Sequence, residues 1–260
     1  MVRLDNLTVS YRQHPALHHI SACFKPASLT AVMGPNGSGK STLLKSIVGL
    51  LPTAGGSATV SVPRDQIAYL PQLTDIDRSF PISVRDCVLL GCWPEKGAWR
   101  GVGKKGLAQV DDALHSVALE GFENRPISSL SSGQFQRVLF ARLLVQDASL
   151  ILLDEPFNSI DSKTTHSLLA LIQQWHQQKR CVIVVLHDEA QALAHFPQTL
   201  LLAREVVAWG ATSEVLTDAH LTRARAMAEA WDEDAELCEI DSPATRSGLR
   251  VQAGQQRQVA

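Results

Sequence analysis

The sequence predicts an α/β fold in which a parallel sheet is covered on both faces. Two apolar runs, residues 150–153 and 181–186, alternate with segments of helical periodicity, an order typical of buried parallel strands. A glycine-rich loop between an apolar strand at residues 28–33 and an expected helix points to the same class. Because 45% of the 260 residues are apolar and 19% charged, the chain can bury the core of one large domain with at most a small appendage.

The first 70 residues combine strand patterns with one helix. Residues 2–10 alternate apolar and polar side chains, as a half-buried strand does, and open an expected N-terminal antiparallel β subdomain. A helix is expected at residues 41–51 and should end at Pro52, because proline cannot continue a helix. The other strands expected in this part of the chain are residues 20–24, 28–33, 53–62 and 66–70.

From about residue 75 to residue 125 the pattern changes to helical segments joined by polar loops. Ser83 is a suitable N-cap for a short helix that follows it, and residues 105–119 form a second amphipathic helix. Between them, residues 91–104 are expected to form a surface loop that exposes Trp93 and Trp99. A helical insert of this kind in an α/β chain is often a subdomain with its own task.

The α/β alternation resumes after Ser128 and leads to a C-terminal helix and tail. The apolar strands are flanked by expected helices at residues 134–145 and 162–178 and followed by a hairpin at residues 200–203 and 206–209. Residues 218–240 are rich in alanine and acidic residues, which favours a helix, and residues 241–260 are polar and expected to be loose. The predicted division is a domain at residues 1–217, with a helical subdomain at about 75–145, and a C-terminal acidic helix and polar tail at 218–260.

Charge and cysteine content exclude several classes of protein. The formal net charge of −2 argues against nucleic-acid binding by a basic surface. The five cysteines are scattered without a CxxC pair, so neither a disulfide framework nor a thiolate zinc site is indicated, and Cys23 and Cys181 are expected to be buried in strands.

The N-terminus lacks a signal-peptide pattern, and no apolar run approaches the ~20 residues of a membrane-spanning helix. We therefore expect a soluble chain that needs a partner for any role at a membrane.

Two further clusters have ordinary explanations. His14, His18 and His19 could bind zinc, but no cysteine or carboxylate stands beside them, and a solvated loop is expected. The acidic stretch at residues 229–239, which includes Cys238, is expected to be a solvated helix face.

Residues 34–41, with the sequence GPNGSGKS, match the phosphate-loop pattern G-x-x-x-x-G-K-[ST] in full. The glycines allow backbone N–H groups to turn towards phosphate oxygens, and the N-terminus of the following helix adds partial positive charge. Lys40 can reach the β- and γ-phosphates, and the Ser41 hydroxyl can be a ligand of Mg²⁺. The motif predicts that the chain binds a nucleoside triphosphate.

Two acidic residues follow the apolar strand at residues 150–153. Asp154 stands where a Walker-B aspartate would hold Mg²⁺ beside the phosphates, and Glu155 is then placed to polarise the attacking water as a general base. Together with the phosphate loop they predict a P-loop NTPase that hydrolyses its nucleotide.

Further motifs, in the same order along the chain, resemble those of ATP-binding-cassette ATPases. Residues 130–134, LSSGQ, resemble the LSGGQ signature, and Gln72 resembles the Q-loop glutamine. Residues 158–161 resemble the D-loop, and His187 resembles the switch histidine. The resemblance covers about residues 1–217. It implies a P-loop NTPase cassette with a parallel-sheet core, an N-terminal antiparallel β subdomain and a helical subdomain, using ATP and Mg²⁺.

The resemblance also implies a role for each site residue. Tyr11 would stack on adenine, and Gln72 would sense Mg²⁺ and water with its neutral amide. The expected catalytic residues are Glu155, His187 and Gln72, and the expected Mg²⁺ ligands are Ser41, Gln72 and Asp154. The expected nucleotide contacts are Tyr11, Gly34, Asn36, Gly37, Ser38, Gly39, Lys40, Ser41, Thr42, Ser131, Gly133, Gln134 and Asp161.

In this family the signature of one chain faces the γ-phosphate held by another, so the resemblance implies a homodimer with two composite sites. One position departs from the family pattern, because Ser132 stands where glycine is usual. Its Cβ and hydroxyl either crowd a close backbone–phosphate approach or add a donor there. Since Gly133 is retained, activity is expected to survive.

The residues around the helical insert favour one subgroup. Residues 68–72 and 80–88, together with Gly91, resemble the zinc- and manganese-type importer ATPases. That resemblance implies a separate integral membrane permease, a periplasmic or lipoprotein metal-binding protein reached only through it, and a peripheral place at the cytoplasmic face of the plasma membrane. Ferric-siderophore and cobalamin importers share part of the pattern and stay open as alternatives. A soluble cassette protein acting on ribosomes or DNA, half of an exporter, and an inactive nucleotide-binding module are further alternatives.

Overall fold

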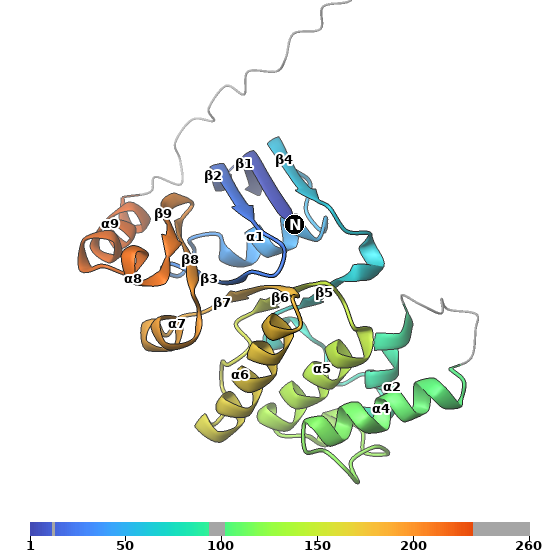
Figure 1. Cartoon of the computed structure of the whole chain (residues 1–260). Helices are drawn as coiled ribbons and strands as arrows, with labels where there is room; N and C mark the ends of the chain where they lie inside the picture. The colour runs from blue at the N-terminus through green and yellow to red at the C-terminus, as the bar shows by residue number, and fades with distance from the viewer. Residues whose placement is uncertain (12–13, 94–101, 231–260) are drawn as a thin grey trace, which may run out of the picture.

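A six-stranded, mostly parallel sheet forms the centre of the molecule in the computed structural model, which describes residues 1–11, 14–93 and 102–230 (Figure 1). Its first five strands are parallel, and the last one is antiparallel to its neighbour. The predicted α/β class is confirmed. In spatial order the strands are β5 (Ile67–Leu70), β6 (Leu150–Asp154), β7 (Cys181–Val185), β3 (Leu29–Met33), β8 (Gln198–Ala203) and β9 (Glu205–Ala211).

The central strands read as continuous apolar runs because both of their faces are buried. In β6, Ile151 and Leu153 belong to the core that the helices cover, whereas Leu150 and Leu152 belong to a second core on the opposite face. All four side chains are fully buried. The parallel sheet is therefore the middle layer of the molecule, as the sequence predicted.

A three-stranded antiparallel sheet and one helix cover the second face. The sheet has the order β2-β1-β4, and Phe24 of β2 packs edge-on against Trp209 of β9 with the ring centroids 5.1 Å apart. The expected N-terminal antiparallel sheet is thus present. These elements are β1 (Val2–Tyr11), β2 (His14–Phe24), β4 (Gly55–Val60) and α1 (Lys40–Ile47).

Helices cover the first face and extend beyond the sheet as a helical part (Figure 1). Ser83 caps α2 as expected, since its hydroxyl accepts a hydrogen bond from the Asp86 N–H at 3.1 Å. Phe140 of α5 stacks on Trp175 of α6 with the centroids 5.6 Å apart. The helices on this side are α2 (Val84–Leu89), α4 (Lys104–Ser116), α5 (Ser132–Gln146) and α6 (Ser162–Gln177).

Short elements complete the described chain. The 3-10 turns are η1 (Arg64–Gln66), η2 (Leu73–Asp75), η3 (Leu90–Cys92) and η4 (Ile127–Ser129). The C-terminal helices are α7 (Glu189–His195), α8 (Thr212–Val215) and α9 (Asp218–Glu229). Helix α9 packs on the main core through Leu221, Ala224 and Met227. Trp99, the acidic stretch after Glu229 and the tail at residues 241–260 lie outside the described residues, whereas Trp93 is exposed as expected.

The structure corrects the expectation for the histidine cluster. His14, His18 and His19 lie in strand β2 and not in a loop. The first part of the strand, before the predicted residues 20–24, escaped the sequence pattern because His19 has a φ of 51°. This conformation interrupts the alternation and turns both Leu17 and Ile20 towards the core. His18 pairs with Glu205 at 2.8 Å. Within the described residues no group of three or more histidine, cysteine, aspartate or glutamate side chains is placed to hold a metal ion, here or elsewhere.

Two other expectations were wrong in detail, and one helix was not expected. Helix α1 ends at Ile47 and not near Pro52, because Gly49 adopts a φ of 74° that does not fit a helix. Cys23 is exposed, since Ala22 and Phe24 on either side of it face the core, whereas Cys181 is buried as predicted. Helix α7 was not expected at all.

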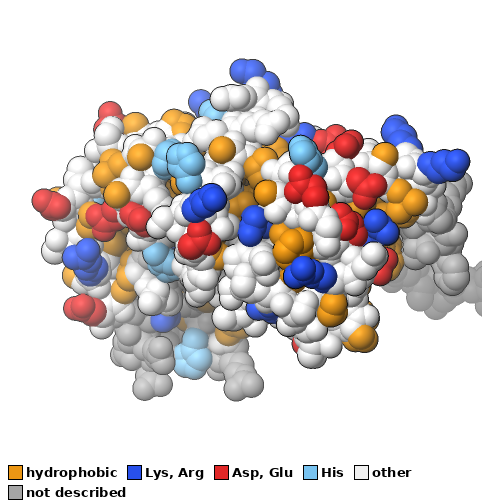
Figure 2. All heavy atoms as spheres, turned by 90° about the horizontal axis from the view of Figure 1, so that it is seen from below, with side chains coloured by type: hydrophobic (Ala, Val, Ile, Leu, Met, Phe, Trp, Pro, Cys, Tyr) orange, Lys and Arg blue, Asp and Glu red, His pale blue; other side chains and the backbone are white. Residues whose placement is uncertain are grey.

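Two surface observations bear on possible partners. Over the face drawn in Figure 2, basic and acidic side chains are interspersed among the described residues, without an extended basic area. None of the helices in the described parts of the chain is long and apolar enough to cross a membrane.

The buried Trp175 gives a test of the packing between α5 and α6. It is 1% exposed, and its indole nitrogen has no hydrogen-bond partner within the described chain. Trp175→Ala should lower the free energy of unfolding by about 4 kcal/mol, because it leaves a large cavity. Trp175→Phe should cost less than half as much, since it keeps the stacking on Phe140 and removes an unsatisfied N–H. Urea unfolding followed by circular dichroism measures both, and equal losses would contradict this account of the packing.

Candidate functional site

The phosphate loop connects β3 to α1 and has a shape that only glycine allows at two positions. A Cβ on Gly34 would lie 1.9 Å from the carbonyl oxygen of Leu202. Gly39, the residue before α1, has a φ of 92°, and a Cβ there would lie 2.5 Å from the Ala16 carbonyl oxygen. The glycines of the motif therefore fix the backbone whose N–H groups surround a phosphate in loops of this type.

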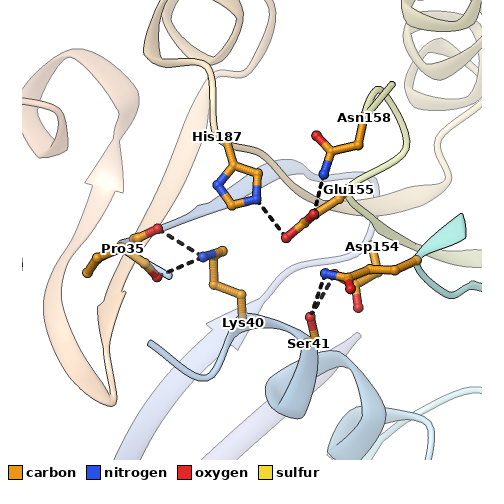
Figure 3. A network of polar contacts seen from close by, with 9 residues as sticks. Pro35, Lys40, Ser41, Asp154, Glu155, Asn158 and His187 are labelled. Carbon is orange, nitrogen blue, oxygen red and sulfur yellow. Dashed lines mark hydrogen bonds and ion pairs between the residues drawn. The ribbon is translucent and has the colours of Figure 1, made fainter. Parts of the chain in front are cut away.

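Lys40 is buried at the start of α1, with 5% of its surface exposed. Its ammonium donates hydrogen bonds to the carbonyl oxygens of Gly34 and Pro35, each at 2.9 Å (Figure 3). Burial lowers the pKa of Lys40, and the nearby carboxylates of Glu155 and Asp154 oppose that shift. A charged lysine held by two neutral carbonyls is well placed to exchange them for phosphate oxygens.

Ser41, Asp154 and Gln72 meet beside this loop. The Ser41 hydroxyl donates to Oδ1 of Asp154 at 3.1 Å, and the Gln72 amide donates to the Ser41 oxygen at 3.3 Å. Oδ2 of Asp154 is buried without a hydrogen-bond partner in the described parts of the chain. Burial raises the pKa of Asp154 to about 6, although the hydrogen bond from Ser41 opposes this shift.

The same three side chains have the chemistry of a Mg²⁺ site. A serine hydroxyl, a carboxylate and an amide offer the oxygen ligands that Mg²⁺ prefers. The unpartnered oxygen of Asp154 and its raised pKa both indicate that a cation would be favourable at this position. The residues predicted as Mg²⁺ ligands therefore lie together and fit the ion.

The two other candidate catalytic residues contact each other directly. Nε2 of His187, in the loop after β7, lies 2.6 Å from Oε1 of Glu155 (Figure 3). The Asn158 amide donates a hydrogen bond to the other oxygen of Glu155. Glu155 has a φ of 49°, a left-handed conformation that is uncommon for a residue with a side chain and typical of functional positions.

One pocket brings many of the predicted residues together. Glu155 and Gln72 line it together with most of the phosphate loop. The lining residues are Ala16, Asn36, Gly37, Ser38, Gly39, Lys40, Ser41, Thr42, Gln72 and Glu155. Tyr11 lies outside this lining, at the end of β1, and is 47% exposed, so it is not a core aromatic residue.

The signature residues form a second, separate constellation at the start of α5. Ser131 and Gln134 make a capping box, in which the Ser131 hydroxyl accepts from the Gln134 N–H at 3.2 Å and the Gln134 amide oxygen accepts from the Ser131 N–H at 3.0 Å. A Cβ on Gly133 would lie 3.5 Å from Oδ2 of Asp161. The signature and the D-loop aspartate are thus neighbours, and among the described residues neither lines the phosphate-loop pocket.

The structure adds polar contacts that the sequence analysis missed. Nζ of Lys45, on α1, pairs with Asp75 at 3.1 Å and so ties the segment after Gln72 to the phosphate-loop helix. The hydroxyl of Tyr69 is buried near Asp154, and burial followed by that carboxylate raises the pKa of Tyr69. The separation of 30 residues between Lys45 and Asp75 leaves no local signal that could have revealed their contact.

The raised pKa of Asp154 predicts a dependence of stability on pH. Its ordinary pKa is 3.8 and its folded pKa is about 6, so the folded chain binds a proton more readily than the unfolded chain. The stability of the nucleotide-free protein should therefore fall between pH 4 and pH 6 through this group and stay lower above. Asp154→Asn should raise the free energy of unfolding at pH 7.5 by about 3 kcal/mol, with little effect at pH 4. Thermal unfolding over this pH range measures the effect, and Asp112→Asn, at an exposed position, is the control. The same pH dependence of stability in both variants would contradict the account.

Comparisons with known proteins agree with the geometry. Residues 17–158 match the family model described as ABC transporter. The zinc transport system ATP-binding protein TroB of Treponema pallidum (strain Nichols) is 40% identical over 228 residues, which are 86% of either chain. The manganese transport system ATP-binding protein MntB of Listeria monocytogenes serovar 1/2a is 38% identical, over 84% of this chain and 92% of its own.

A solved structure of similar fold contains the products of the reaction. The ATP-binding cassette MJ0796, in a dimeric post-hydrolysis state bound to ADP and Pi, superimposes with a TM-score of 0.72. It is 26% identical, and the match covers 82% of this chain and 99% of that one. The chain described here therefore belongs to the ABC transporter family, as an ATP-binding and ATP-hydrolysing component.

Proposed function

We propose that the chain is the ATPase subunit of an importer that moves zinc or manganese ions through a separate membrane permease. The observation that carries the ATPase role is the meeting of Ser41, Asp154 and Gln72 beside a complete phosphate loop, with Glu155 in the same pocket. The metal-ion substrate is supported by the names of the relatives, which are zinc and manganese transport system proteins. These names favour divalent metals over the ferric-siderophore and cobalamin classes.

In the proposed mechanism the phosphate loop binds the triphosphate and Lys40 turns from the carbonyls of Gly34 and Pro35 to the β- and γ-phosphates. Ser41, Asp154 and Gln72 would hold Mg²⁺, which neutralises charge on the phosphate oxygens when bound. Residues 36–39 and Thr42 also line this pocket.

Glu155 would act as the general base that polarises the attacking water. Both oxygens of Glu155 are engaged in the structure, one by His187 and the other by Asn158. A γ-phosphate that accepts a hydrogen bond from His187 would release Glu155 towards the water. The contact between the two residues would thus keep the base occupied until the triphosphate arrives.

The second constellation is proposed to serve a second copy of the chain. Ser131, Gly133, Gln134 and Asp161 line no part of the phosphate-loop pocket of their own chain, at least among the residues described. The N-terminus of α5 is an anion site by its geometry, so in a homodimer it would face the γ-phosphate bound by the partner. Exposed Tyr11 would stack on the adenine.

The partners follow from the same proposal. The helical part would receive the permease at the cytoplasmic face of the plasma membrane, and an extracytoplasmic metal-binding protein would be reached only through that permease. A role on nucleic acid is disfavoured by the interspersed charges in Figure 2 and by the net charge of −2.

The catalytic assignment predicts the behaviour of Glu155→Gln. Removing the base should reduce ATP turnover at least about 100-fold while leaving MgATP binding within about twofold of wild type. The variant should then accumulate as an ATP-bound dimer that size-exclusion chromatography detects. Glu214→Gln, a change of the same kind at an exposed position, is the control. Turnover of Glu155→Gln within tenfold of wild type would exclude Glu155 as the base.

The substrate assignment predicts a metal phenotype. A strain that lacks this chain should contain less zinc or less manganese, measured by mass spectrometry of whole cells, and should grow normally when the same ion is added. The wild-type chain should restore uptake, whereas Glu155→Gln should not. Normal contents of both ions, with a growth defect corrected by a ferric siderophore or cobalamin, would refute the assignment.

A further inference from the structure

The segment that follows Gln72 is fixed to the phosphate-loop helix at its start. The Asp75 N–H donates to the Gln72 carbonyl at 3.0 Å and closes a tight turn, η2. The Asp75 carboxylate pairs with Lys45 of α1 at 3.1 Å. Leu73 and Ile76 pack against the main core. Gln72 and the next few residues are therefore expected to move together with α1.

Three residues after Asp75, Arg78 reaches the start of the signature. One Nη of its guanidinium donates a hydrogen bond to the carbonyl oxygen of Leu130, the residue before Ser131. The guanidinium carbon also lies 5.0 Å from the centre of the Phe135 ring, which is fully buried in the first turn of α5. Arg78 thus contacts the chain on both sides of residues 131–134.

Among the described residues, no carboxylate neutralises the charge of Arg78. No ion pair of Arg78 occurs within residues 1–11, 14–93 and 102–230. Asp77, the nearest acid in sequence, accepts hydrogen bonds from the N–H and the hydroxyl of Ser79 at 2.8 and 2.7 Å. Nε of Arg78 is buried with no acceptor in the described part of the chain.

The positive charge of Arg78 beside the N-terminus of α5 is electrostatically unfavourable for the helix by itself. A helix N-terminus carries partial positive charge, so a cation beside it costs free energy while no anion is present. The same cation becomes favourable once a phosphate approaches the helix, because both then attract the negative charge. An anion that arrives at α5 would therefore be attracted both by the helix N-terminus and by Arg78.

We infer that Arg78 is a positioning residue of the ATPase reaction. It holds the turn at residues 131–134 in place for the γ-phosphate bound by a second copy, and adds positive charge behind that turn. Through Asp75 and Lys45 it also links the nucleotide site of its own chain to the signature that serves the other chain. The inference rests on the composite site proposed above.

The test compares Arg78→Gln and Arg78→Lys in the full chain, each with and without Glu155→Gln. Binding of a fluorescent ATP analogue to the single chain should stay within about twofold, because Arg78 lines no part of the phosphate-loop pocket described. The dissociation constant of the MgATP-bound dimer should rise about tenfold in Arg78→Gln, and kcat should fall about tenfold without a matching rise in KM. Arg78→Lys should show a smaller defect, since lysine keeps the charge but cannot contact the carbonyl and the ring together.

Arg125→Gln is the matched control. Arg125 lies over the ring of Phe122 at 4.1 Å, which is the same kind of contact on a phenylalanine outside the signature. Its loss should leave dimerisation and kcat unchanged. Equal defects in the two glutamine variants would show a general loosening of the helical part and would overturn the inference.

The remaining outcomes are also decisive. Wild-type dimerisation and kcat in Arg78→Gln would overturn the inference. If that variant fails to fold, Arg78→Lys decides alone, and wild-type dimerisation of Arg78→Lys would overturn it. Failure of Glu155→Gln to dimerise with ATP while Arg78 is intact would instead contradict the composite site, and this inference with it.

Discussion

The hydrogen bond between Ser41 and the buried carboxylate of Asp154 is the interaction on which the site depends. It forms because the carboxyl ends of parallel strands meet at one edge of the sheet, where ligands bind in open α/β folds. The phosphate loop follows β3, Asp154 ends β6 and His187 follows β7, which lies between those two strands. Gln72 follows β5 at the same edge. The apolar strands thus bury Asp154, and burial raises its pKa to about 6. One of its carboxylate oxygens has no hydrogen-bond partner among the described residues.

Lys40 and Glu155 are both engaged by other groups of the same chain. Lys40 is held by loop carbonyls, and Glu155 is held by His187 and Asn158. The signature turn is closed by its own capping box of Ser131 and Gln134. Each of these contacts is polar and involves only a few side chains. A charged triphosphate can therefore replace them with a small loss of free energy. Among the described residues, the signature residues and Asp161 lie apart from the phosphate-loop pocket.

Much of this arrangement could be predicted from the sequence, for physical reasons that particular residues make clear. The phosphate loop depends on glycines at fixed spacing, and Asp154 follows a run that must be apolar because both faces of β6 are buried. Strand β2 was only half predicted, since the positive φ of His19 breaks the alternation that identifies a strand. The contacts of Lys45 with Asp75 and of Arg78 with Leu130 join residues 30 and 52 positions apart. Only the tertiary fold brings such residues together, so no local pattern encodes them.

The claim that the two half-sites complete each other across a dimer is tested most directly by mixing two inactive chains. A chain with Lys40→Ala lacks a working phosphate loop, and a chain with Gly133→Asp places a negative charge in the signature beside Asp161. Neither alone should hydrolyse ATP, but half of the dimers in an equal mixture hold one intact composite site. The account predicts that mixing restores about a quarter of the wild-type ATPase rate, or less if the two sites act cooperatively. A mixture no more active than the sum of its two components would contradict it.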